Sequence, residues 1–251
     1  MKIIISPAKK MVENTDDFKI ESLPALLTRA IEILTYLKHL DYDNLKQLWK
    51  CNDELAKLNY ERVQNMELTK LLTPAIVAYQ GIQYQYMAPQ VMEKEELEYL
   101  SSHLCILSAL YGVLRPFDGV TPYRLEMQAK ASISQAKDLY EYWGSQIYDI
   151  VSKDTNLIIN LASKEYSKCI ERYLTKEVSL VTCVFGELVD GKVKEKGTYA
   201  KMARGEMVRY MAENKVESLE QLKEFHRLGY RYHKEVSNEK TMIFIKEDSN
   251  G

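Results

Sequence analysis

The sequence predicts a mixed α/β fold, with one β-sheet flanked by helices in a single domain. Short apolar runs predict strands at Lys2–Ser6, Leu104–Ser108, Leu157–Leu161 and Leu180–Phe185. Segments with helical periodicity lie between these runs, and two hairpin signals follow the last of them. Strands that alternate with helices pair in parallel, whereas hairpins pair antiparallel, so a mixed sheet is expected.

The predicted helices share a capping residue or a proline near their start and an apolar stripe. They cover about residues 22–40, 43–50, 52–66, 137–152 and 198–214, with short helices after Thr73 and Ser218. The run Leu104–Leu114 is ambiguous, because it fits a strand followed by one helical turn or the end of a helix that starts near Glu93.

The hairpin signals lie in the last third of the chain. Asp190-Gly191 marks a turn into Lys192–Lys196. A second hairpin is expected from Gly229–Val236 to Thr241–Lys246. Both would add antiparallel strands to the sheet.

Composition favours one soluble domain over residues 1–251. Hydrophobic residues make up 46% of the chain and can form a sizeable core, and no linker or repeat divides it. The formal net charge is −2, so a surface for nucleic acid would have to be local. No apolar run approaches the ~20 residues of a membrane span. The apolar N-terminus is too short for a secretory signal and indicates the first strand.

The four cysteines and four histidines form no recognisable metal motif, so we expect neither a metal site nor a cofactor. Cys105 and Cys183 lie in apolar runs and are expected to be buried thiols, which fits a reducing cytoplasm. Carboxylates alone could still bind iron, which leaves direct iron binding as a third and weaker functional hypothesis.

The segment Ser108–Met127 combines two arginines with prolines, glycines and acids. Arg115 precedes a proline and Arg124 follows Pro122-Tyr123, so both arginines lie on restricted backbone. Rigidly held guanidinium groups suit phosphate or carboxylate. The alternative is a structural turn in which the arginines pair with Asp118 and Glu126.

Three predicted strands end in a small residue and a hydroxyl, and charged residues follow them. The charged residues include Lys9 after the first strand, Arg115 after the second and Glu165 after the third. If these strands are parallel neighbours, the three side chains would converge on one cleft at the carboxyl ends. The alternative is that serine ends strands and caps helices, as Ser163 would before Glu165-Tyr166.

The segment Lys192–Lys215 is locally basic, with seven Lys or Arg residues against three Glu. On its helix, Lys201, Arg204, Gly205 and Val208 share one side. A glycine inside a helix costs about 1 kcal/mol relative to alanine, which indicates close approach of a backbone or a ligand. The alternative is a solvated helix face.

Four blocks give the chain a resemblance to the YaaA family of bacterial peroxide-stress proteins: IISPAKKM, ILSALYGVLRPFDGVTPYRLEM, NLASKEYSK and KMARGEMVRYM. They extend from residue 3 to residue 211 in the expected order. The resemblance implies a cytoplasmic α/β protein with a positively charged cleft. It also implies a role in keeping unincorporated iron low, and so limiting oxidative damage, during hydrogen peroxide stress.

The resemblance further implies DNA binding through a helix-hairpin-helix-like element. This element would map to Leu107–Arg115, with Tyr111-Gly112-Val113 as its hairpin, and it supports a helical interpretation of that stretch. Leu114 stands where the usual hairpin pattern has a second glycine.

Two functional hypotheses follow. In the first, a basic groove binds the phosphates of double-stranded DNA without reading sequence. Its candidate residues are Lys9, Lys10, Arg115, Arg124, Lys164, Lys201 and Arg204. In the second, the protein is an enzyme for a small phosphorylated or nucleobase-like molecule, a small anionic ligand. Its candidate catalytic residues are Lys9, Glu126 and Glu165, with one of the glutamates as acid or base.

Overall fold

The computed structural model describes residues 1–14 and 17–247. Its main sheet contains the strands β1 (Lys2–Ile5), β5 (Leu104–Ser108), β6 (Gly112–Leu114), β8 (Leu157–Leu161), β9 (Ser179–Val189), β10 (Lys192–Lys194), β11 (Tyr230–Tyr232) and β12 (Thr241–Lys246). The spatial order is β11-β12-β9-β8-β1-β5-β6, and β10 pairs with β9 beside this path. Two small ribbons pair β2 (Lys10–Met11) with β4 (Tyr79–Gln80), and β3 (Thr73–Pro74) with β7 (Gly119–Val120).

The sheet is mixed, as the sequence predicts. Strands β12, β9, β8, β1 and β5 run parallel, and β6, β10 and β11 pair antiparallel. The four strands predicted from apolar runs are confirmed, although β9 is longer than expected. Both predicted hairpins are confirmed, and positive φ angles at Asp190 and Gly191 make the first turn.

The helices flank this sheet. They are α1 (Leu27–His39), α2 (Tyr42–Trp49), α3 (Asp53–Asn65), α4 (Ala75–Ala78), α5 (Ile82–Met87), α6 (Lys94–His103), α7 (Leu139–Trp143), α8 (Gln146–Ser152), α9 (Lys164–Glu171), α10 (Gly197–Glu213) and α11 (Leu219–Lys223), with 3₁₀ turns at Pro89–Val91 and Lys234–Val236. The predicted caps Asn52 and Ser218 are confirmed, because each side chain accepts a backbone N–H in the first turn. The helix predicted at 137–152 is broken at Gly144 into α7 and α8.

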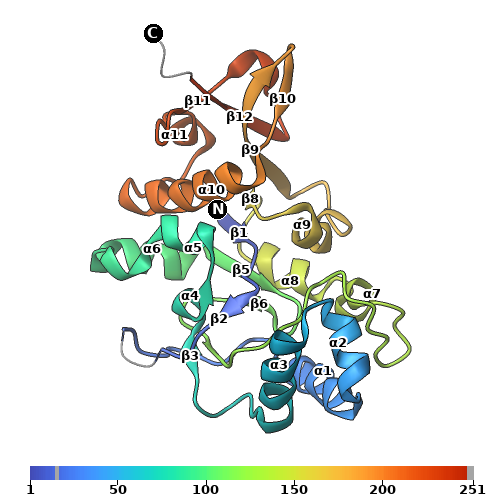
Figure 1. Ribbon diagram of the computed structural model, residues 1–251. Helices are drawn as coiled ribbons and strands as arrows, with labels where there is room; N and C mark the ends of the chain where they lie inside the picture. Colours follow the sequence, from blue (N-terminus) through green and yellow to red (C-terminus); the bar gives the residue numbers. More distant parts are fainter. Residues whose placement is uncertain (15–16, 248–251) are drawn as a thin grey trace.

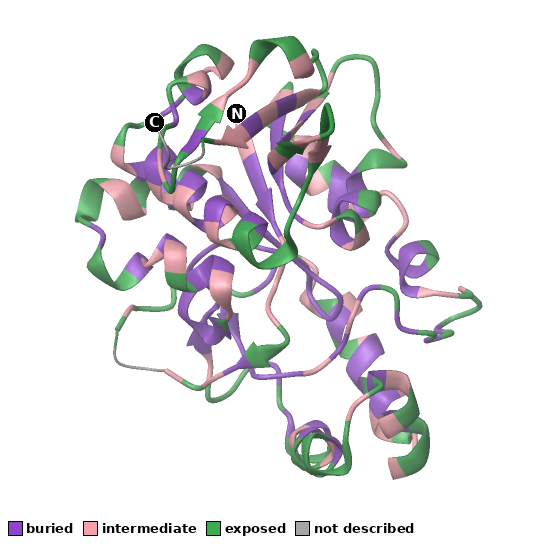
Figure 2. Ribbon diagram, turned by 45° about the horizontal axis from the view of Figure 1, so that its top comes forward, coloured by how far each residue is buried: buried purple, intermediate pink, exposed green. Residues whose placement is uncertain are grey.

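Helices lie on both sides of the sheet, with α5, α6 and α10 on one side and α8 and α9 on the other (Figure 1). Helices α1, α2 and α3 form a separate group beyond β6 in the same view. The central strands are buried along most of their length, whereas the outer helices alternate between buried and exposed residues (Figure 2). Among the residues described, no helix is both long and apolar enough to cross a membrane.

The ambiguous run at 104–114 contains no helix. Helix α6 ends at His103, and β5 starts at Leu104 and turns back into β6. Gly112 makes this turn with φ +75°, and a Cβ there would lie 2.8 Å from Leu26 and 3.1 Å from the Trp143 ring. The helical interpretation of Leu107–Arg115 is therefore wrong, and the expected helix-hairpin-helix-like element is a buried β-hairpin instead.

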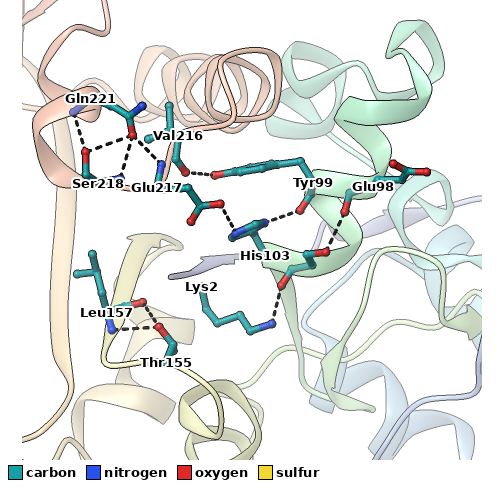
Figure 3. Close-up of polar contacts among 11 residues, drawn as sticks. Lys2, Glu98, Tyr99, His103, Thr155, Leu157, Val216, Glu217, Ser218 and Gln221 are labelled. Atoms are coloured by element: carbon teal, nitrogen blue, oxygen red, sulfur yellow. Dashed lines mark hydrogen bonds and ion pairs between the residues drawn. The ribbon is translucent and has the colours of Figure 1, made fainter.

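Polar contacts join the amino end of β1 to α6, and join α6 in turn to the segment after α10 (Figure 3). The Lys2 ammonium donates to the Ser102 carbonyl at 2.6 Å. His103 Nε2 lies 3.0 Å from the Glu217 carboxylate. The hydroxyl of Tyr99 donates to the carbonyl of Val216, and its ring stacks on His103. These contacts lie near the amino end of β1, opposite the carboxyl ends of the parallel strands.

Helix α10 packs closely on α5, and Gly205 makes this approach possible. A Cβ at Gly205 would lie 2.2 Å from the Gln83 carbonyl oxygen and 3.0 Å from the Met87 nitrogen. Val208, one turn later, is fully buried. The glycine therefore serves a backbone contact, and this side of the helix is buried at Gly205 and Val208 but exposed at Lys201.

We predict that Gly205→Ala lowers the free energy of unfolding by about 2 kcal/mol or more, because α10 and α5 must separate to admit the methyl group. Urea denaturation would measure the loss. Gly197→Ala in the same helix is the control, since a Cβ there meets nothing within 4 Å. Equal stability of the two variants would contradict the close approach.

Candidate functional site

The carboxyl ends of β1 and β8 form a topological switch point. The chain that leaves β1 crosses to β5, whereas the chain that leaves β8 crosses to β9 on the opposite side. Two neighbouring parallel strands with diverging connections leave a crevice between them, and ligands of open α/β sheets bind there.

Side chains from both strands and from α5 build the floor of this crevice. The Ser6 hydroxyl accepts the Ser163 backbone N–H at 2.8 Å and donates to the Ser163 hydroxyl at 3.2 Å. The Gln83 amide donates to the Leu161 carbonyl, and the Tyr84 hydroxyl donates to the Ser6 carbonyl. Ser163 stands at the N-cap position of α9, but its hydroxyl makes no capping hydrogen bond.

A cavity of about 530 Å³ lies over this floor, which is within the range of small-molecule sites. We call it the switch-point cavity. Its charged lining residues are Lys9, Lys10, Arg124, Glu126, Glu165, Lys201 and Arg204. Seven of the residues singled out in the sequence, from four separate blocks, therefore share one cavity. Arg115 and Lys164 do not line it.

Arg115 lies toward the other end of the sheet, so its expected convergence with Lys9 and Glu165 is wrong. Strand β6 runs antiparallel to β5, and Leu114 pairs with Ile106, which carries the chain back from the carboxyl edge. Arg115 is exposed and contributes, with Lys2, to the electrostatic surroundings of Cys105. The sequence shows that Arg115 follows the predicted strand Leu104–Ser108. It does not show that the chain reverses direction between this strand and Arg115.

Neither arginine makes the ion pair of the alternative turn hypothesis. Asp118 is buried and accepts the backbone N–H of Arg115 at 2.8 Å and the Ser22 hydroxyl at 2.5 Å. Burial raises the pKa of this carboxyl. Glu126 pairs with Lys9 at 2.7 Å, so its carboxylate is not available to Arg124 in this arrangement.

Glu165 is the second carboxylate of the switch-point cavity, and it has no ion-pair partner among the described residues. It is half-buried in the first turn of α9 and accepts the Gln128 backbone N–H at 3.3 Å. Burial raises the pKa of this carboxyl, the nearby Glu126 charge raises it further, and Lys9 opposes the rise. A carboxyl with a raised pKa in a ligand-size cavity suits general acid–base chemistry.

Helix α10 forms another wall of the cavity through Lys201 and Arg204. The Arg204 guanidinium lies 3.3 Å from the Glu195 carboxylate, and only 15% of its side chain is exposed. Lys201 is exposed and has no hydrogen-bond or ion-pair partner within residues 1–14 and 17–247. Their placement depends on the close packing of α10 on α5.

Sequence reasoning missed the uncharged walls of the cavity. Tyr84, Tyr123 and Tyr166 line it, together with Gln80 and Gln83 near the start of α5. The run Tyr79–Met87, where tyrosine and glutamine follow a glycine, was the available signal. Helix α5 is not among the helices expected from the sequence.

No group of three or more His, Cys, Asp or Glu residues in the described part of the chain could hold a metal ion. Cys105, Cys169 and Cys183 are buried free thiols, and burial raises the pKa of each.

The fold and the cavity define an α/β protein with a charged, ligand-size site at the switch point of a mostly parallel sheet. The chain belongs to the family described as peroxide stress protein YaaA, whose family model matches residues 1–236. The resemblance found in the sequence is thereby confirmed.

Curated relatives match over nearly their whole lengths. A UPF0246 protein from Lachnoclostridium phytofermentans is 58% identical over 250 residues, covering 100% of this chain and 98% of the relative. UPF0246 proteins from Pediococcus pentosaceus and Limosilactobacillus reuteri are 53% and 46% identical, covering 99% and 97% of this chain and 99% and 98% of the relatives.

We predict that Glu165 titrates above the ordinary glutamate range, and that Glu126→Gln lowers its midpoint whereas Lys9→Gln raises it. Carboxyl carbon NMR at increasing pH would measure these shifts. The folded carboxyl keeps its proton to higher pH than the unfolded one, so its contribution to stability falls as pH rises through that interval. Glu165→Gln should remove this loss of stability with rising pH. A Glu165 midpoint within the ordinary glutamate range would refute the electrostatic description.

Proposed function

We propose that the protein acts in the cytoplasm during peroxide stress, through a small molecule that binds in the switch-point cavity. The family assignment supports the stress role. Limitation of damage linked to unincorporated iron is the physiological effect that we expect from the resemblance.

The chemical function that the geometry supports best is an enzyme for a small phosphorylated or nucleobase-like molecule. One observation carries this proposal: two carboxylates and five cationic side chains line the same cavity at the switch point. A surface that only binds DNA phosphates would gain nothing from carboxylates among its lining residues, because carboxylates repel phosphate.

The two carboxylates have different environments, which separates their proposed roles. Glu126 is tied to Lys9, so this pair would orient the ligand. Glu165 has a raised pKa and no cation within ion-pair distance among the described residues, so it would exchange the proton. The cations of α10 and Arg124 would hold the anionic part of the ligand.

The test is a thermal-shift screen of the full chain against nucleotides, nucleosides and sugar phosphates, followed by mass spectrometry of incubated hits. We expect Glu165→Gln to bind a hit but to convert it about 10²–10⁴-fold more slowly. Glu171→Gln, on the same helix and outside the cavity lining, should keep full turnover. A screen without any hit, or full turnover by Glu165→Gln, would remove the enzyme proposal.

Double-stranded DNA is a second candidate ligand, favoured by exposed lysines at the cavity. Lys9, Lys10 and Lys201 are exposed and line it. Lys10 and Lys201 have no acidic partner among the residues described. They could contact phosphates of a duplex that lies across the opening.

We predict that DNA affinity, if this candidate holds, falls steeply as salt rises from about 50 to 200 mM. Fluorescence anisotropy with a labelled duplex would measure it. The double variant Lys10→Gln/Lys201→Gln should reduce the slope of log affinity against log salt by about 2. Lys57→Gln/Lys94→Gln, outside the cavity, is the control. A flat salt response or no binding at low salt would exclude DNA.

A further inference from the structure

The guanidinium of Arg124 lacks an acceptor. Within residues 1–14 and 17–247 it makes no hydrogen bond and no ion pair, and its Nε is buried without a partner. Burial of this Nε without a hydrogen bond costs free energy, because the donor has lost its hydration and gained no acceptor. Arg124 lines the switch-point cavity, where a ligand could supply the acceptor.

The neighbouring carboxylates do not supply this acceptor. Glu126, two residues along the chain, is held by Lys9 at 2.7 Å. Glu165 accepts a backbone N–H from Gln128 and is not within ion-pair distance of Arg124. The charges of the cavity are thus arranged so that Arg124 stays unneutralised.

The backbone that carries Arg124 is held firmly through Tyr123. The Tyr123 hydroxyl is hydrogen-bonded to Ser108 Oγ at 2.7 Å and to the Tyr79 hydroxyl at 3.0 Å. Its backbone N–H donates to Met11 Sδ at 3.4 Å. All four residues are buried. A planar guanidinium on a fixed support binds an oxyanion with little further loss of conformational freedom.

Two further cations on α10 favour a doubly charged ligand group. Arg204 also has a buried Nε without a partner, and its contact to Glu195 is long at 3.3 Å. Lys201 lies one turn before it and lines the same cavity. Arg204 is already paired with Glu195, so Arg124 and Lys201 leave two cationic charges without a carboxylate partner among the described residues. A single carboxylate would neutralise one of them, whereas a phosphate monoester carries about two charges at neutral pH.

We propose that Arg124, Arg204 and Lys201 form a phosphoryl-binding subsite, with Arg124 as the principal ligand contact and Tyr123 as its positioning residue. This inference rests on the proposed function and specifies its substrate class as a phosphate monoester. The uncharged body of the molecule lies against the tyrosine walls, and the subsite directs its other polar groups toward Glu165.

Isothermal titration calorimetry of the full chain with ribose 5-phosphate, gluconate and ribose tests the subsite. We expect ribose 5-phosphate to bind at least tenfold more tightly than the carboxylate or the neutral sugar. Arg124→Gln should weaken binding of ribose 5-phosphate by about tenfold or more, as expected for loss of a charge-assisted hydrogen-bonded pair. The matched control is Arg115→Gln, which removes the same charge outside the cavity and should change affinity by less than about twofold.

Tyr123→Phe provides a second variant that keeps every charge. It removes the two hydroxyl contacts and should weaken ribose 5-phosphate binding several-fold, while circular dichroism shows an intact fold. If the hydroxyl has only a structural role, stability falls and affinity for ribose 5-phosphate is unchanged. Arg124→Lys, which keeps the charge without the planar fork, should restore only part of the affinity.

Equal affinity for ribose 5-phosphate and ribose, or unchanged affinity in a folded Arg124→Gln variant, would overturn the subsite. Adenosine separates this failure from failure of the proposed function. If adenosine binds and is converted in a Glu165-dependent reaction while Arg124→Gln has no effect, the enzyme proposal stands and the phosphoryl subsite is wrong. If neither ribose 5-phosphate nor adenosine binds, the phosphoryl subsite is wrong, and the enzyme proposal is also wrong if the full screen of nucleotides, nucleosides and sugar phosphates gives no hit.

Discussion

The divergence of the chain after β1 and β8 is the constraint on which the rest of the structure depends. These strands are parallel neighbours, and their connections leave in opposite directions. Neither crossover connection covers the point between them, so a crevice remains at the carboxyl ends of the two strands. The hydrogen bond between Ser6 Oγ and the Ser163 N–H closes its floor, and Gln83 and Tyr84 fasten α5 to the same two strand ends.

The charge pattern of the cavity follows from how helices are placed around this crevice. Helix α10 brings Lys201 and Arg204 to it only because Gly205 lets the helix approach the α5 backbone. Helix α9 starts directly after Ser163, so Glu165 in its first turn is half-buried beside the floor. A chain with a net charge of −2 thereby gathers five cationic side chains in one place.

The segment Ser108–Met127 shows why neighbouring residues of similar chemistry end in different surroundings. After β5 the hairpin at Gly112 turns the chain back, and Arg115 is exposed away from the cavity. The chain then returns to the carboxyl edge, where Tyr123 bonds to Ser108 and Arg124 lines the cavity. The buried Asp118 stabilises the intervening turn through the Arg115 N–H and the Ser22 hydroxyl. Two arginines nine positions apart are thus separated by a reversal of the backbone.

The sequence by itself determined the mixed α/β class, four strands of the main sheet, the two hairpins and most helices, because apolar periodicity, caps and turn residues act locally. It did not show β6 or the short strands of the two small ribbons. It also singled out the seven charged residues that meet in the cavity, from the recurrence of charge after strands and the glycine in the basic helix. Only the tertiary structure decided that Arg115 and Lys164 lie outside and that α5 and three tyrosines complete the walls. It also decided which charges are paired. Strand direction and ion pairing depend on contacts between residues far apart in the chain, and these contacts leave no periodic pattern in the sequence.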